Sequence, residues 1–347
     1  MMADSSKEMV FCSKETQQPR RRRSEIKRLK SALTPELESY PKNTKTSPAE
    51  EEEGGGEHGK GTPENETRGL VYGHVSMMGR RRVMEDAVTV APQGSLADEY
   101  SFFAVYDGHG GAMVAEVCSE RLHKCLEKHI ENMKKQPEED DFDWKTVMED
   151  CFSRIDEEFE ESKGKEVRAS TAAVEKRTMG TTAVVVLVGN GDVVVANCGN
   201  SRAVLCRGGA PVPLSSDHKP ERPDEKERVE AAGGSIINRK GWRVQGVLPT
   251  SRSIGDHHLK PYISSQPEVT VTKRTESDDF LIIATDGLWD MVSNELACKV
   301  VEKSLRGGLG SRKSEGQCAS DAAATLVELA IAKGSRDNIT VIVVLLQ

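Results

Sequence analysis

Hydrophobic and polar positions along the chain change character near Leu70. Residues 1–69 show no hydrophobic periodicity, and they contain a basic run, an acidic run from Glu50 to Glu53 and a glycine-rich stretch. Such a composition buries too little apolar surface to offset the entropy lost on ordering. We therefore expect a disordered tail over residues 1–69 and one folded domain over residues 70–347.

The clearest strand pattern runs from Thr181 to Cys206. Two valine-rich segments, Ala183 to Val188 and Val193 to Asn197, flank the dipeptide Asn190-Gly191. Asn-Gly between β-branched runs is a strong hairpin signal because both residues tolerate the positive φ angles of a tight turn. The segment predicts an antiparallel meander that continues into Ala203 to Cys206.

Helical spacing of apolar residues occurs at Ala112 to Met133, Trp144 to Phe159 and Cys318 to Ala332. These segments do not alternate regularly with strands, which favours α+β layers over a doubly wound parallel sheet. We interpret the charged stretches Glu138 to Asp141 and Gly164 to Arg177 as surface loops.

Net charge, cysteine spacing and the length of apolar runs exclude several classes of function. The 347 residues carry a formal net charge of -8, so we expect no general nucleic-acid binding, which needs surplus Lys and Arg. The eight cysteines form no Cys-x-x-Cys pair and predict reduced, buried thiols of an intracellular protein. No apolar run has membrane-spanning length, and we expect neither a signal peptide nor membrane association.

Localisation to nucleus and cytoplasm is the corresponding expectation. The basic residues Arg20 to Arg23, with Lys27, Arg28 and Lys30, are either a nuclear import signal or the charges of a solvated tail. The sequence leaves both interpretations open.

The first candidate site residues are two aspartates, each followed by glycine, at the ends of two predicted apolar strands. Phe102 to Tyr106 leads into Asp107-Gly108, and Phe280 to Thr285 leads into Asp286-Gly287. We expect the backbone to turn at both places and the two carboxylates to share one metal site, together with the acids at Glu85, Asp86 and Asp337. An isolated acid at a glycine turn is more often a simple turn or capping residue.

Oxygen-rich ligands of this kind suit hard cations, whereas zinc needs histidines or thiolates at short spacing. We therefore expect two Mn²⁺ or Mg²⁺ ions, with Asp107 bridging them and the Gly108 carbonyl as a backbone ligand. Two such ions acidify water and stabilise the oxygens of a phosphoryl transfer, so hydrolysis of a phosphomonoester is the predicted reaction.

Two further residues fit this reaction. Arg81 lies just before Glu85 and offers a guanidinium for phosphate oxygens, and His109 lies beside Asp107 as a general acid for the leaving alkoxide. The alternatives are a solvated arginine patch and an imidazole that only bonds to a carbonyl.

These segments resemble the type 2C family of metal-dependent protein phosphatases over essentially all of residues 70–347. The motifs that carry the resemblance are Arg81 to Asp86, Asp107 to Gly111, Gly180 to Thr182, Ser251 to Asp256, Asp286 to Asp290 and Asp337-Asn338. The resemblance implies a fold of two packed antiparallel β-sheets flanked by helices, with a two-metal centre at one end.

It also implies the role of each site residue. Metal is bound by Glu85, Asp107, Gly108, Asp286 and Asp337, and through a water molecule by Asp86, while Arg81 holds phosphate and His109 is the acid.

Finer features resemble the plant abscisic-acid signalling clade. They are Val71 to Gly73, Asp217 to Pro220, Arg222 to Glu225 and Gly246 to Leu248. This resemblance implies that phosphorylated Ser/Thr stress-signalling kinases are the substrates, that the enzyme is a negative regulator, and that hormone-bound receptors inhibit it.

Two departures from the clade pattern change these expectations. Arg239 stands where the clade has the tryptophan that contacts the receptor, and Trp242 stands at its usual alanine, so we expect weak or absent receptor inhibition. Asn200 replaces an aspartate associated with a third metal, which predicts a weakened third site.

The rival function is that of a catalytically weak relative that occupies the cleft of a kinase and blocks it. We expect the protein to be a monomer.

Overall fold

The computed structural model describes residues 70–96, 100–134, 143–161, 178–308 and 314–346. The predicted tail over 1–69, its basic run and both predicted surface loops lie outside these residues. Within the described ranges, no helix combines the length and apolarity needed to cross a bilayer.

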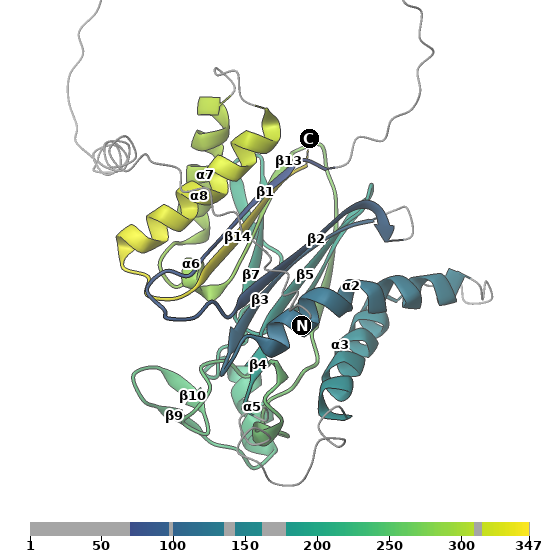
Figure 1. Cartoon of the computed structure of the whole chain (residues 1–347), viewed down its shortest axis with the longest axis vertical. Coiled ribbons are helices and arrows are strands. Elements are labelled where there is room, and N and C mark those ends of the chain that lie inside the picture. Colours follow the sequence, from purple (N-terminus) through teal and green to yellow (C-terminus); the bar gives the residue numbers. More distant parts are fainter. Residues whose placement is uncertain (1–69, 97–99, 135–142, 162–177, 309–313, 347) are drawn as a thin grey trace, which may run out of the picture. The chain divides into compact units, whose positions relative to one another are not determined.

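The described strands form two main sheets in which neighbouring strands run antiparallel (Figure 1). The five-stranded sheet has the order β1 (Tyr72–Met77), β14 (Ile339–Leu345), β13 (Asp278–Ala284), β7 (Arg202–Arg207) and β8 (Ala210–Pro213). The seven-stranded sheet has the order β11 (Ile254–Gly255), β4 (Gly180–Thr181), β3 (Tyr100–His109), β5 (Ala183–Val188), β6 (Asp192–Cys198) and β12 (Glu268–Lys273), with β2 (Asp86–Leu96) paired to β3.

Side chains of alternate strand residues build different cores because they point to opposite faces of a sheet. Phe103 packs between the two sheets with Leu205 and Ile283, whereas its neighbour Phe102 faces outward against helices. Helices α2 (Met113–Lys134) and α3 (Trp144–Glu161) cover the seven-stranded sheet, and α7 (Asn294–Gly308) and α8 (Glu315–Lys333) cover the other. The predicted α+β fold of two packed antiparallel sheets flanked by helices is confirmed.

Smaller elements lie in the connections. They are α5 (Pro223–Ala231), the hairpin of β9 (Ile236–Asn238) and β10 (Trp242–Val244), the 3-10 helix η1 (His257–Leu259) and α6 (Asp286–Trp289). The predicted hairpin around Asn190-Gly191 is confirmed, with Val188 opposite Val193. All three helices predicted from apolar spacing are present as α2, α3 and α8, whereas α5 and α7 were not predicted.

The expected turn at Asp107 is wrong. Strand β3 continues through Asp107 to His109 because both sides of it find partners: Asp107 lies opposite Asp86 of β2, and His109 lies opposite Gly180 of β4. At the second strand end, Asp286 begins helix α6 instead of a glycine turn. Both carboxylates are therefore held by regular backbone, which fixes their direction more firmly than a loop does.

Candidate active site

Acidic side chains from separate parts of the chain meet at one end of the sheets. Asp86 and Asp107 lie opposite each other on β2 and β3, Asp286 lies in the first turn of α6, and Asp337 precedes β14. Helix α6 contacts β14, as its position in Figure 1 shows. The tertiary fold thus brings together carboxylates that are up to 251 positions apart in sequence, from Asp86 to Asp337.

The surroundings of these carboxylates disfavour their ionised form. Burial, followed by repulsion from neighbouring carboxylates, raises the pKa of Asp86, Asp107 and Asp286. Asp107 and Asp286 also share a side-chain hydrogen bond. Buried like charges are costly without a compensating cation, and a concentration of raised carboxyl pKa values is typical of functional sites.

Nearby donors already contact some of these carboxylates and a neighbouring one. The Asn200 Nδ2 donates to the Asp286 Oδ2 at 2.7 Å, the Lys219 Nζ lies 3.1 Å from the Asp290 Oδ1, and the Arg81 Nη2 lies 2.8 Å from the Asp337 Oδ2. In the part of the chain that the structure describes, no three His, Cys, Asp or Glu side chains already enclose a point for a metal.

The donor set nevertheless fits hard divalent cations. The Asp86 Oδ1 is buried without a hydrogen-bond partner, while its Oδ2 accepts from Thr340 at 2.8 Å and Thr285 at 3.1 Å. Such an orphaned oxygen is suited to a ligated water or an ion. These oxygen donors suit the predicted Mn²⁺ or Mg²⁺.

Backbone packing explains why glycine follows the central acid. The Gly108 N–H donates to the Glu85 carbonyl at 3.2 Å, and a Cβ on Gly108 would collide with that same carbonyl. Glu85 is in turn held by its own N–H, which donates to the Asn338 Oδ1 at 2.8 Å. Glycine at 108 therefore lets the segment at Glu85, just before β2, lie directly against the strand that carries Asp107.

His109 has a partner, Asp256, that is distant in sequence. Its Nε2 lies 2.6 Å from the Oδ2 of Asp256, which is almost fully buried and also accepts from the Ser253 Oγ at 2.6 Å. Asp256 itself has a left-handed backbone with φ of 46°, a conformation that a non-glycine residue adopts at a cost. The one sequence signal was that Asp256 ends the Ser251 to Asp256 motif.

A cavity of about 280 Å³ opens beside the acidic cluster. Its lining includes Asp286 and Asp337 together with the guanidinium-bearing residues Arg81 and Arg336. The Arg81 side chain is 53% exposed, so it can reach an incoming anion. Arg80 and Arg82 are also exposed but do not line this cavity. His109 lies outside the lining as well.

Comparisons with known proteins identify the family of this chain. Residues 70–339 match the family model described as "Protein phosphatase 2C". The chain is similar to "Probable protein phosphatase 2C 8" of Oryza sativa subsp. japonica, with 51% identity covering 79% of this chain and 73% of that protein. It is also similar to "Protein phosphatase 2C 3" of Arabidopsis thaliana, with 43% identity covering 79% and 70%.

Solved structures give the same fold. A serine-threonine phosphatase 2C from Toxoplasma gondii has a TM-score of 0.67 at 23% identity, covering 80% of this chain and 95% of that one. A C. elegans sex determining protein has a TM-score of 0.69 at 24% identity, covering 81% of this chain and 65% of that one. With the family match over most of its length, the chain belongs to the protein phosphatase 2C family and is a metal-dependent protein serine/threonine phosphatase.

Proposed function

We propose that the acidic cluster is a centre for two Mn²⁺ or Mg²⁺ ions that hydrolyses phosphoserine and phosphothreonine in proteins. The observation that carries the proposal is the meeting of Asp86, Asp107, Asp286 and Asp337 beside the exposed Arg81. In this proposal Glu85 and the Gly108 carbonyl complete the metal ligands, and Asp86 contributes through a water molecule.

When bound, the ions supply an acidified water and charge that stabilises the transferred phosphoryl group. The protein's own groups do the rest. Arg81 exchanges its bond to Asp337 for the phosphate oxygens, for which a guanidinium fork is well shaped. His109, oriented by Asp256, delivers a proton to the leaving serine or threonine oxygen.

A phosphopeptide assay tests this assignment. Purified protein should release phosphate from phosphothreonine and phosphoserine peptides with Mn²⁺ and lose that activity in EDTA. The Arg81→Lys variant should mainly raise KM, since a lysine keeps the charge but loses the two-pronged contact. An Arg80→Lys variant is the matched control and should behave like wild type. If the folded protein releases no phosphate with either Mn²⁺ or Mg²⁺, the proposal is contradicted.

The proposed substrates are phosphorylated Ser/Thr kinases of stress signalling in the abscisic-acid pathway, on which the enzyme acts as a negative regulator. The clade-like segments Asp217 to Pro220 and Arg222 to Glu225 support this, as does the similarity to phosphatases of rice and Arabidopsis. A panel of phosphorylated plant kinases is the test. Equal rates on stress kinases and on unrelated phosphoproteins would contradict the assignment.

Regulation by hormone-bound receptors is proposed to be weak. Arg239 begins the turn between β9 and β10, its N–H donates to the Gly241 carbonyl at 2.9 Å, and its side chain folds back beside Gly246. A side chain in this position does not offer the projecting indole that the clade pattern requires. Trp242, on β10, is 42% exposed on the same hairpin, opposite Asn238.

Titration with hormone-bound receptor tests this regulation. We expect little inhibition of wild type and a gain of at least tenfold in sensitivity for Arg239→Trp. The Trp242→Ala variant is the control, because an unchanged titration shows that Trp242 does not replace the missing indole. Stoichiometric inhibition of wild type would overturn the proposal.

The rival function, a catalytically weak relative that occupies a kinase cleft, rests on one contact. Asn200 donates to Asp286 where an aspartate would add negative charge. Inhibition of an already phosphorylated kinase in Mg²⁺ and ATP, by protein that releases no phosphate from it in Mn²⁺ or Mg²⁺, is the result that favours it.

A further inference from the structure

Two pairs of cysteines contact each other in the described part of the chain, and their surroundings differ. Cys125 of α2 packs against the core that contains Cys151 of α3, and Cys206 of β7 shares another core with Cys298 of α7; within each pair the two thiols affect each other's pKa. Cys206 and Cys298 are each 1% exposed, as is Cys151, but Cys125 is half-buried. All four thiols are free. The α2–α3 pair is therefore the accessible one of the two.

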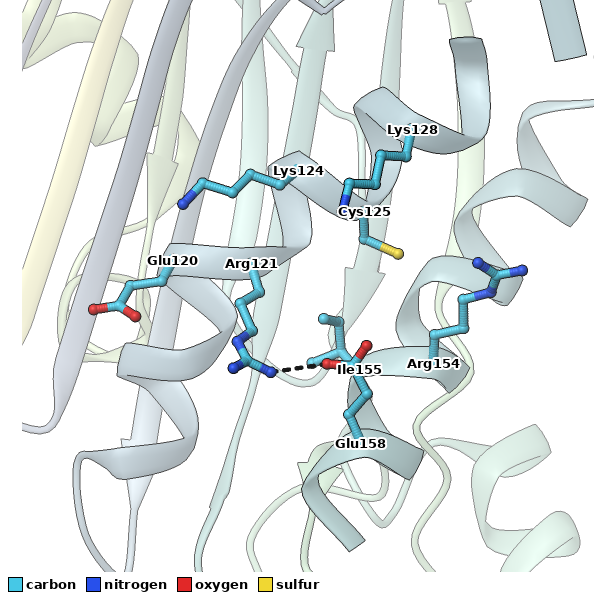
Figure 2. Close-up of a pocket in the computed structure, with 8 residues that line it drawn as sticks. All are labelled: Glu120, Arg121, Lys124, Cys125, Lys128, Arg154, Ile155 and Glu158. Atoms are coloured by element: carbon cyan, nitrogen blue, oxygen red, sulfur yellow. Dashed lines mark hydrogen bonds and ion pairs between the residues drawn. The ribbon is translucent and has the colours of Figure 1, made fainter. Parts of the chain in front are cut away.

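Cys125 opens onto a cavity of about 450 Å³ between α2 and α3 (Figure 2). Figure 2 shows its sulfur in the space between the helices, with Lys128 next to it on α2 and Arg154 across from it on α3. A cavity of this size admits a small solute to the Cys125 sulfur. The prediction that the cysteines are buried thiols is thus wrong for Cys125.

Charge and hydrogen bonding around Cys125 favour its thiolate. The Cys151 S–H donates to the Cys125 sulfur and, with help from Arg154 and Lys128, lowers the pKa of Cys125 to about 7 against the opposing effects of burial and Glu158. The same bond raises the pKa of Cys151 and keeps it a thiol. A reactive thiolate next to a protonated thiol is the arrangement in which one sulfur attacks and the other resolves.

We propose that Cys125 and Cys151 form a peroxide-sensitive modification site that closes to a disulfide between α2 and α3. The Cys125 thiolate attacks one oxygen of a hydroperoxide, the O–O bond breaks, and the sulfur becomes a sulfenic acid as hydroxide or alkoxide leaves. The Cys151 thiol then attacks that sulfur, a S–S bond forms, and water leaves with the Cys151 proton. Two electrons pass from the two thiols to the peroxide.

The second pair supplies an internal control. Burial raises the pKa of both Cys206 and Cys298, so neither offers a thiolate near neutral pH, and they do not line the α2–α3 cavity. The two pairs share the sulfur–sulfur contact and differ in access and charge. If contact alone governed oxidation, both pairs would react at similar rates.

Peptide mass spectrometry of the full-length wild-type protein provides the test. The protein is treated with hydrogen peroxide, blocked with iodoacetamide and digested with trypsin without reduction. Cleavage after Lys124, Lys128, Lys145 and Arg154 places the two cysteines in separate short peptides, residues 125–128 and 146–154. We expect these peptides to become disulfide-linked at least tenfold faster than the peptides that contain Cys206 and Cys298.

Two variants identify the order of events. In Cys151→Ser, dimedone should label Cys125 because no thiol resolves the sulfenic acid, and in Cys125→Ser, Cys151 should stay alkylatable. No linkage of 125–128 to 146–154 in wild type would overturn the proposal, as would equal oxidation of the Cys206–Cys298 pair. Linkage of Cys125 to any other cysteine would overturn it too. The wild-type digest decides the question even if a variant does not fold.

Discussion

Two groups of buried carboxylates in this molecule have opposite surroundings. In the acidic cluster, Asp107 faces Asp86 and Asp286, and burial with like-charge repulsion raises its pKa. Glu225 of α5 is 1% exposed, yet it accepts from Arg252 at 2.6 Å, Arg228 at 2.9 Å and Ser251 at 2.6 Å. Burial tends to raise the pKa of Glu225, but these hydrogen bonds outweigh it and lower the pKa.

The surroundings of a buried carboxylate distinguish a binding site from a structural ion pair. A buried carboxylate that already has cations and hydroxyl donors stabilises the fold, whereas one that faces other carboxylates stores unfavourable energy until a ligand relieves it. The two groups are linked through the chain. Glu225 holds Ser251 and Arg252, which lie just before the Asp256 that holds His109.

The largest effect should come from Asp107→Asn. Removing the central carboxylate should lower kcat/KM on the order of a thousandfold, since the proposed metal centre would lose its central ligand. The fold should survive because a repulsive charge is lost. Mn²⁺ should raise the unfolding temperature of wild type and not of the variant, as differential scanning fluorimetry can show. A variant that keeps wild-type activity would contradict the assignment of the acidic cluster as the active site.

Glu225→Gln should show the reverse pattern. Arg228 and Arg252 lose their shared counter-charge, so the free energy of unfolding should fall by about 3 kcal/mol. Urea denaturation monitored by tryptophan fluorescence measures this fall. The control is Glu230→Gln, because Glu230 lies on the same helix and pairs with Lys226 at an exposed position, and it should cost less than about 0.5 kcal/mol.

The contribution of Glu225 should also depend on pH. Its folded pKa lies below the ordinary value of 4.5, so its stabilising effect is present above that value and is lost as the pH falls below it. The stability difference between wild type and Glu225→Gln should shrink by about 1 to 2 kcal/mol between about pH 5 and pH 3. A difference that stays constant over this range would show that packing, not charge, explains the variant.

Asp256→Asn tests the link between the two groups. The Asp256 carboxylate orients the His109 ring, so its loss should lower kcat about tenfold to a hundredfold while KM and Mn²⁺ affinity change little. Steady-state kinetics at saturating Mn²⁺ separate these quantities. If KM and metal affinity change as much as kcat, Asp256 belongs to the metal centre instead.

The smallest effect should come from Asn200→Asp. An added carboxylate beside Asp286 should strengthen the proposed third cation site and raise activity a few-fold at high Mg²⁺. It should also lower stability slightly without metal, because it replaces a donated hydrogen bond with a like charge. Activity against Mg²⁺ concentration, compared between variant and wild type, is the measurement.

Much of the fold followed from local pattern. The Asn190-Gly191 hairpin and helices α2, α3 and α8 were predictable because their turn chemistry or apolar spacing is written in adjacent residues. The apolar spacing does not predict helix α5 because most of its residues are charged. The helix is held instead by long-range ion pairs, from Arg222 to Glu268 and from Glu225 to Arg252. The continuation of β3 through Asp107 was missed because its partners, β2 and β4, come from other parts of the chain.

The sequence by itself predicted the type of chemistry, because acid–glycine pairs after two apolar runs and an arginine before Glu85 suit a hard cation and a phosphate. Only the tertiary structure decided which groups face each other. Asp256 reaches His109 across 147 positions, and Cys125 meets Cys151 across two packed helices. The physical reason is that charge, hydrogen bonding and burial depend on neighbours in space, which the folded chain brings together from distant segments.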